Sequence, residues 1–328
     1  MKIYFVTPAD SPLADPGGEM LAAIRRAMMA EGGATETVRA SDADALVLPE
    51  KYSFKEWRYI ERILSDPLIG PNITRTYTIN ADDCATGLLR GVYTSLPSDR
   101  FDAAIHAIVP YTFYPNQYVL SAGPAGTAER RYLATWRGNP KSNAKLRGKL
   151  IQNHAGNGEI FVSETTSWLN HPGDEKKTYV DLMQAGKFSL CPAGWAPITF
   201  RVYESMALGV APVVIADRSV LPPGPNWSEC SIRVPEAALS DLSQLLKAYE
   251  SRFLEMGKKA REAWERYFSP ERAAAFYATS LLTCMERSLG SSNFAEEKRR
   301  MCSFGMYWSN EWTIPQRVVN KVRRLVSR

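Results

Sequence analysis

The sequence predicts an α/β protein built from two domains with parallel sheets, and three observations support this prediction. The chain has 328 residues, which suits two domains of about 150 residues each. Short apolar strands alternate with helical segments along most of its length, the pattern of βαβ units. The clearest unit lies in 187–236, where apolar runs at 188–191 and 211–216 flank a helical segment at 199–208.

Composition is that of an ordinary globular protein and excludes several classes of protein. Apolar residues make up 45% and charged residues 23% of the chain, and 40 basic against 35 acidic residues give a net charge of +5. So mild a basic excess indicates a solvated surface, with contact to an anionic substrate or a membrane surface as the alternative. Basic and aromatic residues form no joint motif, so nucleic-acid binding is not indicated.

Cysteine usage indicates a reducing compartment. The five cysteines form no Cys-x-x-Cys pair and lie apart from the three histidines, so neither a disulfide framework nor a zinc site is expected. The N-terminal apolar stretch ends at Pro8, too early for a signal peptide. No other apolar run reaches the roughly 18 residues of a membrane span. We therefore expect a cytoplasmic protein.

The first half of the chain alternates strands and helices. Apolar runs predict strands at 2–7, 44–49, 75–80 and 101–109. Helical patterns lie at 19–30 and in a segment that opens with a capping box at 53–56 and stops at Pro67. A stretch rich in Ser, Ala, Gly and Pro at 121–131 is typical of a linker. It places one domain at 1–125, a second at 126–290 and a helical extension at 291–328.

The second half repeats this pattern. Strands are expected at 131–136, within 154–173, and at 188–191, 211–216 and 230–234; helices are expected at 144–151, 178–185, 199–208, 240–254, 256–267 and 269–288. In the tail, Val318, Val322 and Leu325 recur at helical spacing opposite basic residues. This predicts a C-terminal helix that packs its apolar stripe on the body, with peripheral contact at the inner membrane face as the alternative.

The helix at 199–208 carries the clearest chemical pattern. Thr199 can cap its start, which leaves the backbone N–H groups of Phe200 and Arg201 pointing at the crevice. A helix N-terminus and a guanidinium fork both suit phosphate oxygens. Glu204 follows one turn later and suits the hydroxyl pair of a ribose. This spacing indicates a nucleotide-sugar site, and a surface Arg–Glu pair is the alternative.

The stretch around this helix resembles the C-terminal signature of the exostosin-like glycosyltransferases. That pattern has Cys-Pro-x-Gly at the end of a strand, Ser/Thr-x-Arg opening a helix and an acidic residue one turn later. It continues with Gly-x-x-Pro-Val-Val/Ile-Ile and an Asp, and it ends near a Trp and Arg-Val-Pro. In this chain the pattern falls at 191–194, 199–201, 204, 209–217, 227 and 233–235, and weaker similarity extends to 132–139 and 76–83.

The resemblance implies a GT-B fold, in which two Rossmann-like domains face each other across a cleft and the donor lies mainly on the C-terminal domain. It implies that Arg201 holds the donor diphosphate, Glu204 the donor ribose or sugar, and that Gly194 allows close backbone approach. The Asp217 loop and the loop that begins at Arg137 would lie beside the same crevice. For these two loops, a strand-end cap and an ordinary turn are the alternatives.

The resemblance also favours inversion of the transferred sugar. Many retaining GT-B enzymes carry two glutamates eight positions apart around this helix, whereas Ala196 stands eight positions before Glu204. An inverting transfer needs one base to take the proton of the acceptor hydroxyl. This base is expected from the N-terminal domain, and Asp82 and Asp83, which follow the third strand, are the candidates.

Asp10 and His106 are the reserve candidates for the base. No metal and no other cofactor is expected, because Arg201 and a helix N-terminus can neutralise the leaving diphosphate. The pair Asp42-Ala43-Asp44 precedes its strand, whereas the metal-binding Asp-x-Asp of the other common glycosyltransferase fold follows one. The expected partners are a nucleotide-sugar donor, first of all a UDP-sugar, and a saccharide or lipid-linked saccharide acceptor.

Together these points predict an inverting, metal-independent glycosyltransferase that acts in surface polysaccharide or glycan synthesis. One alternative is a retaining or GDP-sugar-using transferase of the same fold. Another is a catalytically silent module that keeps the nucleotide pocket. A nucleotide-dependent oxidoreductase is not indicated, because no Gly-x-Gly-x-x-Gly follows any predicted strand.

Overall fold

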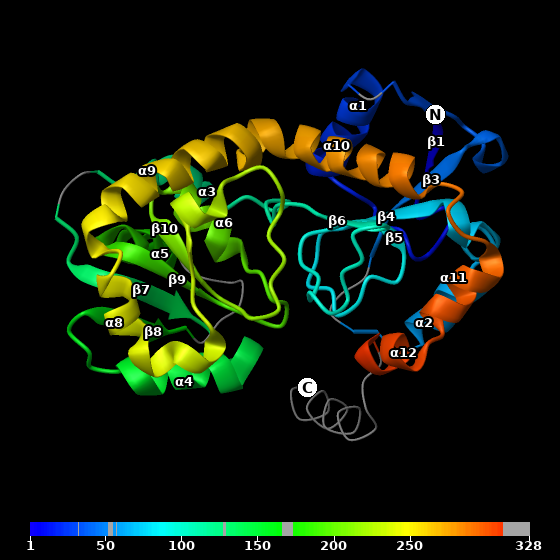
Figure 1. Ribbon diagram of the computed structural model, residues 1–328. Coiled ribbons are helices and arrows are strands. Elements are labelled where there is room, and N and C mark those ends of the chain that lie inside the picture. Colours follow the sequence, from blue (N-terminus) through cyan, green and yellow to red (C-terminus); the bar gives the residue numbers. More distant parts are fainter. Residues whose placement is uncertain (32, 52–54, 57, 127–128, 166–172, 311–328) are drawn as a thin grey trace. The chain divides into compact units, whose positions relative to one another are not determined.

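The computed structural model describes residues 1–31, 33–51, 55–56, 58–126, 129–165 and 173–310 (Figure 1). The chain divides into two compact units. Unit 1 contains residues 1–109 and the C-terminal residues from Tyr277 onward, and unit 2 contains Pro110–Phe276. Each unit is built on its own sheet, so the prediction of an α/β protein with two Rossmann-like domains is confirmed.

The sheet of unit 1 has six parallel strands in the order β2-β1-β3-β4-β5-β6. The two central strands are buried along their whole length, as expected for a parallel sheet that is covered on both faces. The strands are β1 (Lys2–Phe5), β2 (Thr35–Glu36), β3 (Ala45–Pro49), β4 (Thr76–Asn80), β5 (Arg90–Tyr93) and β6 (His106–Ile108).

The helices of unit 1 come from both ends of the chain. Its N-terminal part supplies α1 (Glu19–Glu31) and α2 (Tyr59–Ser65). Its C-terminal part supplies the end of α10 (Pro270–Ser288), then α11 (Phe294–Met301) and α12 (Phe304–Asn310). Asn293 and Glu296 form a capping box that starts α11. No helix in the described part of the chain combines the length and the apolar character that a membrane crossing requires.

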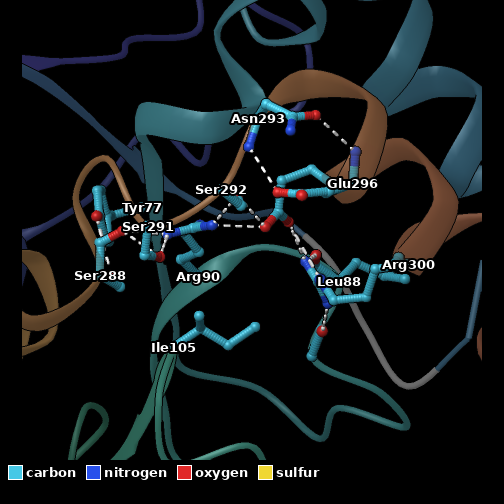
Figure 2. A network of polar contacts seen from close by, with 12 residues as sticks. Tyr77, Leu88, Arg90, Ile105, Ser288, Ser291, Ser292, Asn293, Glu296 and Arg300 are labelled. Atoms are coloured by element: carbon cyan, nitrogen blue, oxygen red, sulfur yellow. Dashed lines mark hydrogen bonds and ion pairs between the residues drawn. The ribbon is translucent and has the colours of Figure 1, made fainter.

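A buried ion-pair network fastens the C-terminal helices to the first sheet (Figure 2). Arg90 of β5 pairs with Glu297 of α11 at 2.5 Å, and the two side chains are only 1% and 6% exposed. Arg90 also donates to the carbonyl of Ser288 and to the hydroxyl of Ser291. Arg300 donates to Glu297 at 2.8 Å and to the carbonyls of residues 87 and 88. Residues 277–310 therefore belong to unit 1.

The sheet of unit 2 has five parallel strands in the order β11-β10-β9-β7-β8. The strands are β7 (Tyr132–Gly138), β8 (Ile160–Glu164), β9 (Gly186–Pro192), β10 (Ala211–Ile215) and β11 (Ile232–Arg233). The helices around them are α3 (Gln117–Ala122), α4 (Ala144–His154), α5 (Gly173–Ala185), α6 (Phe200–Ala207), α7 (Trp227–Cys230), α8 (Leu242–Lys247) and α9 (Phe253–Ala263), followed by a π-helical turn at Trp264–Phe268 (Figure 1). One apolar core joins the sheet to these helices.

Both sheets contain a point at which the strand order reverses. In unit 2 the chain moves from β7 outward to β8 and returns to the other side of β7 as β9. In unit 1 it moves from β1 to β2 and returns to the other side of β1 as β3. At such points the loops leaving two neighbouring strands diverge to opposite faces of the sheet, which opens a crevice at the carboxyl ends of the strands.

The structure divides the chain at other positions than those expected at 125/126 and 290/291. Residues 110–125 join unit 2, because Val119 enters its core and the N–H of Ala125 donates to the carbonyl of Leu208. Residues 277–310 join unit 1, and the network of Arg90 holds them there, so the described part of 291–328 does not form a separate extension.

Most predicted elements are present, with local differences. The short strands β2 and β5 were not predicted, and the strand expected at 230–234 is reduced to Ile232–Arg233 because α7 ends at Cys230. The described start of the second helix is Tyr59. Residues 53–54 of the capping box expected at 53–56, and the basic C-terminal helix expected at 317–328, lie outside the described residues.

Candidate functional site

The residues singled out in the C-terminal half gather at the point of unit 2 where the strand order reverses. Arg137 lies near the end of β7, and Gly194 follows the end of β9. Thr199 precedes α6, and Arg201 and Glu204 lie on it. β7 and β9 are paired neighbours, so their carboxyl ends lie beside each other, at the edge of the sheet where ligands of such folds generally bind.

Arg201 is fixed in place by contacts from two sides. Its Nη2 donates to the main-chain carbonyl of Arg137. Its guanidinium lies 4.8 Å from the centre of the Tyr179 ring and 6.0 Å from that of Trp136. A Cβ atom at Gly138 would stand 2.9 Å from the Trp136 ring and 3.2 Å from the Arg201 Nη2, so glycine is required for this approach. The arginine is therefore oriented before a ligand arrives.

Glu204 is oriented by two donors. Its Oε1 accepts from Nδ2 of Asn116 at 2.8 Å, and its Oε2 accepts from the hydroxyl of Tyr179. Burial raises the pKa of this tyrosine well above its usual value, and the Glu204 carboxylate raises it further, so Tyr179 stays a donor at neutral pH. Each carboxylate oxygen can accept a second hydrogen bond, so Glu204 retains the capacity to accept ligand hydroxyls.

Arg147 of α4 ties the two strand ends together. Its three nitrogens donate to the carbonyls of Asn139 at 2.9 Å, Pro192 at 3.2 Å and Ala193 at 3.1 Å. A Cβ atom on Gly194 would lie 3.1 Å from Nη2 of Arg147. Gly194 therefore allows close approach, as expected, but the approaching group is the guanidinium of Arg147. This contact joins the loop after β7 to the loop after β9.

Four buried polar atoms around the crevice have no hydrogen-bond partner within the described part of the chain. They are Nε of Arg137, Nδ2 of Asn139, Nε1 of Trp136 and Oγ1 of Thr199. Asn139 is 7% exposed, and its Oδ1 is already occupied by the N–H of Lys141. Three of the four atoms are N–H donors, and buried donors generally require an acceptor. The oxygen atoms of a ligand could supply such acceptors.

Thr199 does not act as the side-chain cap that the sequence suggested. It occupies the N-cap position with an extended backbone, but its hydroxyl makes no capping hydrogen bond. The N–H of Val202, a group that such a cap would bind, donates instead to the main-chain carbonyl of Thr199. Phe200 is 43% exposed, and its ring centre lies 4.2 Å from that of Tyr111.

Arg137 and Asp217, whose loops were both expected beside the donor, have different contacts. Arg137 donates to the hydroxyl of Ser163 at 3.3 Å and lies 3.9 Å from Glu175, so its guanidinium is only loosely paired. Asp217 is held by Glu236 in a reciprocal pair, in which each main-chain N–H donates to the other side chain at 3.2 and 3.0 Å. This pair closes the loop after β10. Asp217 therefore caps the end of that strand, which was the alternative to a role beside the donor.

The candidate bases lie at the carboxyl edge of the first sheet, as expected. Asp82 is accessible to solvent, and its Oδ1 accepts from the N–H of Asp83 at 2.7 Å. Partial desolvation raises the pKa of the Asp82 carboxyl, and the hydrogen bond from Asp83 lowers it in part. The N–H of Asp82 donates to Asn80 at the end of β4. A raised pKa suits proton acceptance near neutral pH, but the role of both residues stays a prediction.

The reserve candidates are less suited to this role. His106 is buried at 1% exposure, and burial, followed by the charge of Arg300, lowers its pKa to about 3. The N–H of Asp102 donates to its Nδ1 at 3.1 Å. Asp10 accepts from the N–H and hydroxyl of Thr7, and although burial opposes the effect, these bonds lower its pKa. His106 is therefore a structural residue of the core.

The spaced aspartates of the N-terminal half have structural partners. Asp42 pairs with Arg39 at 2.7 Å, and Asp44 accepts from the N–H of Lys2 at 2.7 Å. Within the described residues, no three His, Cys, Asp or Glu side chains lie close enough together to hold a metal ion.

Sequence reasoning missed several residues that build this site. Trp136, Arg147, Tyr179 and Asn116 each contact a predicted residue or its loop. Arg147 and Tyr179 lie on helices whose surface pattern is unremarkable, so no local signal marks them. The adjacency of Trp136 to Arg137 and Gly138 is the one sequence feature that could have drawn attention to this group.

The fold of unit 2 is Rossmann-like, and sheets of this kind generally bind ligands at the point where the strand order reverses. The arginines at this point of unit 2 would suit an anionic ligand that is rich in oxygen. Residues 27–249 match the family model of the exostosin GT47 domain, which covers more than half of the chain. The chain therefore belongs to the exostosin GT47 family.

Known relatives match shorter stretches. A probable glucuronosyltransferase of Oryza sativa subsp. japonica is 29% identical over 155 residues, which are 44% of this chain and 34% of that protein. A probable beta-1,4-xylosyltransferase of Arabidopsis thaliana is 40% identical over 75 residues, or 22% of this chain and 18% of that one. The chain thus spans about a third, or less, of the length of these relatives.

Among solved structures, the crystal structure of TarM matches 71% of this chain and 42% of its own, at a TM-score of 0.34 and 10% sequence identity. A likeness of this degree is too remote to transfer any property to this chain.

Proposed function

We propose that the chain is an inverting glycosyltransferase that takes a sugar from a nucleotide diphosphate sugar, first of all a UDP-sugar, and transfers it to a saccharide. The observation that carries this proposal is the oriented guanidinium of Arg201, together with buried N–H donors of Trp136, Arg137 and Asn139 that have no partner among the described residues. Such donors suit the oxygens of a diphosphate, because charge-assisted hydrogen bonds from a preorganised fork bind them bidentately.

In this proposal the residues of unit 2 bind the donor and stabilise its leaving group. Arg201, Arg137 and Asn139 hold the diphosphate, and the first turn of α6 adds N–H groups that have no intrahelical partner. Glu204, oriented by Tyr179 and Asn116, accepts the donor hydroxyls. These groups are already in position to stabilise the negative charge that develops on the diphosphate. Such electrostatic stabilisation is usually the largest contribution to lowering the activation free energy.

The transfer itself needs a base for the acceptor. The acceptor hydroxyl oxygen bonds to the anomeric carbon, the bond from that carbon to the diphosphate breaks, and the hydroxyl proton passes to a carboxylate. Asp82 and Asp83 are the proposed carboxylates. Inversion is supported by Ala196, a buried residue at the position where retaining enzymes of this fold carry their first glutamate.

A binding assay tests the donor site first. UDP, GDP, CMP and their sugars are compared by the melting temperature of the protein. A ligand at one hundred times its dissociation constant adds about 2.7 kcal/mol of stability. We expect UDP to raise the melting temperature of the wild type and not that of Arg201→Ala. If no nucleotide shifts it, the assignment of the donor site is wrong.

A turnover assay then tests the chemistry. Release of UDP from UDP-sugars and the anomeric configuration of the product, read by NMR, separate inverting from retaining transfer. Binding without sugar release from any donor would identify a catalytically silent module. Asp82→Asn and Asp83→Asn are expected to lower kcat by about 100- to 10,000-fold at an unchanged donor KM for whichever residue is the base.

A further inference from the structure

A buried carboxylate lies at the carboxyl edge of the sheet of unit 1. Glu50 follows β3 directly and is 7% exposed, and its main-chain N–H donates to the carbonyl of Ile79 at 3.0 Å. Burial of a carboxylate is costly, because the charged group loses its contact with water. Burial raises the pKa of the Glu50 carboxyl, although the hydrogen bonds that it accepts lower the pKa in part. Acidic groups perturbed in this way are concentrated at functional sites.

Three buried side chains donate hydrogen bonds to Glu50. The hydroxyl of Tyr59 donates to Oε1 at 2.7 Å. The hydroxyl of Thr78 and Nδ2 of Asn80 donate to Oε2 at 2.8 and 3.1 Å. All three donor residues are fully buried. A buried polar network of this kind specifies one arrangement of its members, because an unpaired polar group in the interior is costly.

The amide of Asn80 has one orientation that suits these contacts. Its NH2 group must face Oε2 of Glu50, because a carboxylate oxygen can only accept. Its Oδ1 therefore points away from Glu50 and accepts from the main-chain N–H of Asp82 at 3.2 Å. If the amide were reversed, oxygen would face oxygen at Glu50, and two N–H donors would face each other at Asp82. Glu50 thus decides which end of the amide Asp82 meets.

A second contact holds the main chain of Asp82. The hydroxyl of Thr94 donates to the carbonyl of Asp82 at 3.1 Å, and the N–H of Thr94 donates to the carbonyl of Asn80 at 3.2 Å. In the side chain of Asp82, Oδ1 accepts from the N–H of Asp83 at 2.7 Å. Oδ2 accepts no hydrogen bond from another described residue. Asp82 therefore presents one oxygen from a main chain that is fixed at both its N–H and its carbonyl.

We propose that Glu50 is a positioning residue for the transfer: by fixing the amide of Asn80, it holds Asp82 where the carboxylate can take the proton of the acceptor hydroxyl. The inference rests on the proposed function and selects Asp82 from the two proposed carboxylates. The carboxylate of Glu50 is occupied by three donors, so Glu50 acts through Asn80 and not on a ligand. A base must lie within hydrogen-bonding distance of the proton that it takes, so displacement of Asp82 slows the transfer.

Two variants of Glu50 test this role by steady-state turnover. Glu50→Ala removes the acceptor for Asn80 and should lower kcat about 10-fold at an unchanged donor KM, because the base is displaced while unit 2 still binds the donor. Glu50→Gln should keep kcat within about threefold of the wild type, because its amide can place the oxygen against Asn80 and the NH2 group against the hydroxyl of Tyr59, which can accept.

Combined variants test whether the effect passes through Asp82. In an Asp82→Asn background, Glu50→Ala should lower kcat no further, because residues that act through one another have non-additive effects. Asp66→Ala is the matched control, since Asp66 is also a buried carboxylate of unit 1 and accepts from Ser11 and from two main-chain N–H groups. Asp66→Ala should lose stability but keep the kcat of the wild type.

Amide hydrogen exchange gives a result that does not depend on turnover. NMR of protein labelled with 15N-aspartate follows the N–H of Asp82, which donates to Asn80 in the wild type. Glu50→Ala should speed its exchange about 10-fold, whereas Glu50→Gln and Asp66→Ala should leave the rate within about twofold of the wild type. If circular dichroism shows that Glu50→Ala does not fold, Asn80→Ala takes its place, because it breaks the same link and should give the same changes in kcat and exchange.

Three results would overturn the inference. They are unchanged exchange at Asp82 in the alanine variant, a kcat of Glu50→Gln as low as that of Glu50→Ala, and a full further loss of kcat from Glu50→Ala in the Asp82→Asn background. If exchange responds as expected but the wild type transfers no sugar, the link from Glu50 to Asp82 stands and the proposed function fails. If the wild type transfers sugar and exchange does not respond, the proposed function stands and the inference fails.

Discussion

Arg201 is held between an aromatic ring and a main-chain carbonyl, so its fork already points in a defined direction. Side chains fixed in advance lose less conformational entropy when a ligand binds. A lysine at this position would keep the charge but lose the planar, bidentate geometry and the stacking on Tyr179.

We therefore expect Arg201→Lys to lower kcat/KM for the nucleotide-sugar about 10- to 100-fold, a loss of roughly 1.4 to 2.7 kcal/mol of transition-state stabilisation. Steady-state kinetics with a labelled donor measure it. Arg266→Lys is the control, because Arg266 also stacks on a tyrosine, at 5.2 Å from the Tyr267 ring, but lies outside the site. Equal activity of Arg201→Lys and the wild type would contradict the assignment.

A variant of Tyr179 tests whether this tyrosine orients Glu204 for donor binding. Tyr179→Phe removes the hydroxyl that donates to Oε2 and leaves the carboxylate with Asn116 as its protein donor. A hydrogen bond to a charged group contributes about 1.5–3 kcal/mol, of which we expect a part to appear as a donor KM raised about fivefold with kcat little changed. Tyr249→Phe, at a partly exposed tyrosine of the same unit, should behave as the wild type in the same assay.

At the scale of elements, α11 is joined to β5 by a charge pair that is almost inaccessible to water. Glu297 also accepts from Ser292 and Arg300. Although burial alone would raise its pKa, the charge of Arg300 and the hydrogen bonds from Ser292 and Arg90 keep the pKa below its usual value. The polar contact between α11 and β5 thus involves an ionised carboxylate.

Glu297→Gln should destabilise unit 1 strongly, because it leaves the buried guanidinium of Arg90 without its counter-charge. Breaking one partner of a buried pair costs about 3–5 kcal/mol, which chemical denaturation would show as a lower midpoint. Glu286→Gln, at an exposed glutamate of α10, should change the free energy of unfolding little. Similar stability of the two variants would mean that α11 is held mainly by other contacts.

For the whole molecule, acid should weaken unit 1 in two steps. His106 has a folded pKa of about 3, against about 6.5 in an unfolded chain. Between these values the unfolded state binds more protons, so stability falls as pH decreases from about 6.5. Glu297 has a depressed pKa, so its contribution is present above the ordinary glutamate pKa and is lost as pH falls through its folded value.

The first step can be isolated with His106→Asn, which keeps an acceptor for the N–H of Asp102 but does not titrate. Free energies of unfolding measured at pH 7.5 and 5.5 should fall more for the wild type than for this variant. The same decrease in both proteins would show that other groups control the acid response. Because two units can unfold separately, each transition is followed on its own.

Elements that a short stretch of sequence encodes were predicted, and elements that depend on distant contacts were not. The continuous apolar run of β3 and the period of the helix at 199–208 were sufficient for these elements. β5 was missed because Arg90 is buried within it, which its sequence does not suggest. The domain boundary was misplaced because glycine and proline at 121–131 mark a turn but not which sheet the segment joins.

In the candidate site, too, some residues could be predicted from the sequence and others could not. Local periodicity over a few residues was sufficient to predict the α/β class and the spacing of Thr199, Arg201 and Glu204 along one helix. The partners of these residues became known only from the folded structure. Tyr179 and Asn116 lie 25 and 88 positions from Glu204, and Glu297 lies 207 positions from Arg90. Such contacts depend on which strands pair and where their order reverses, and no local pattern records this.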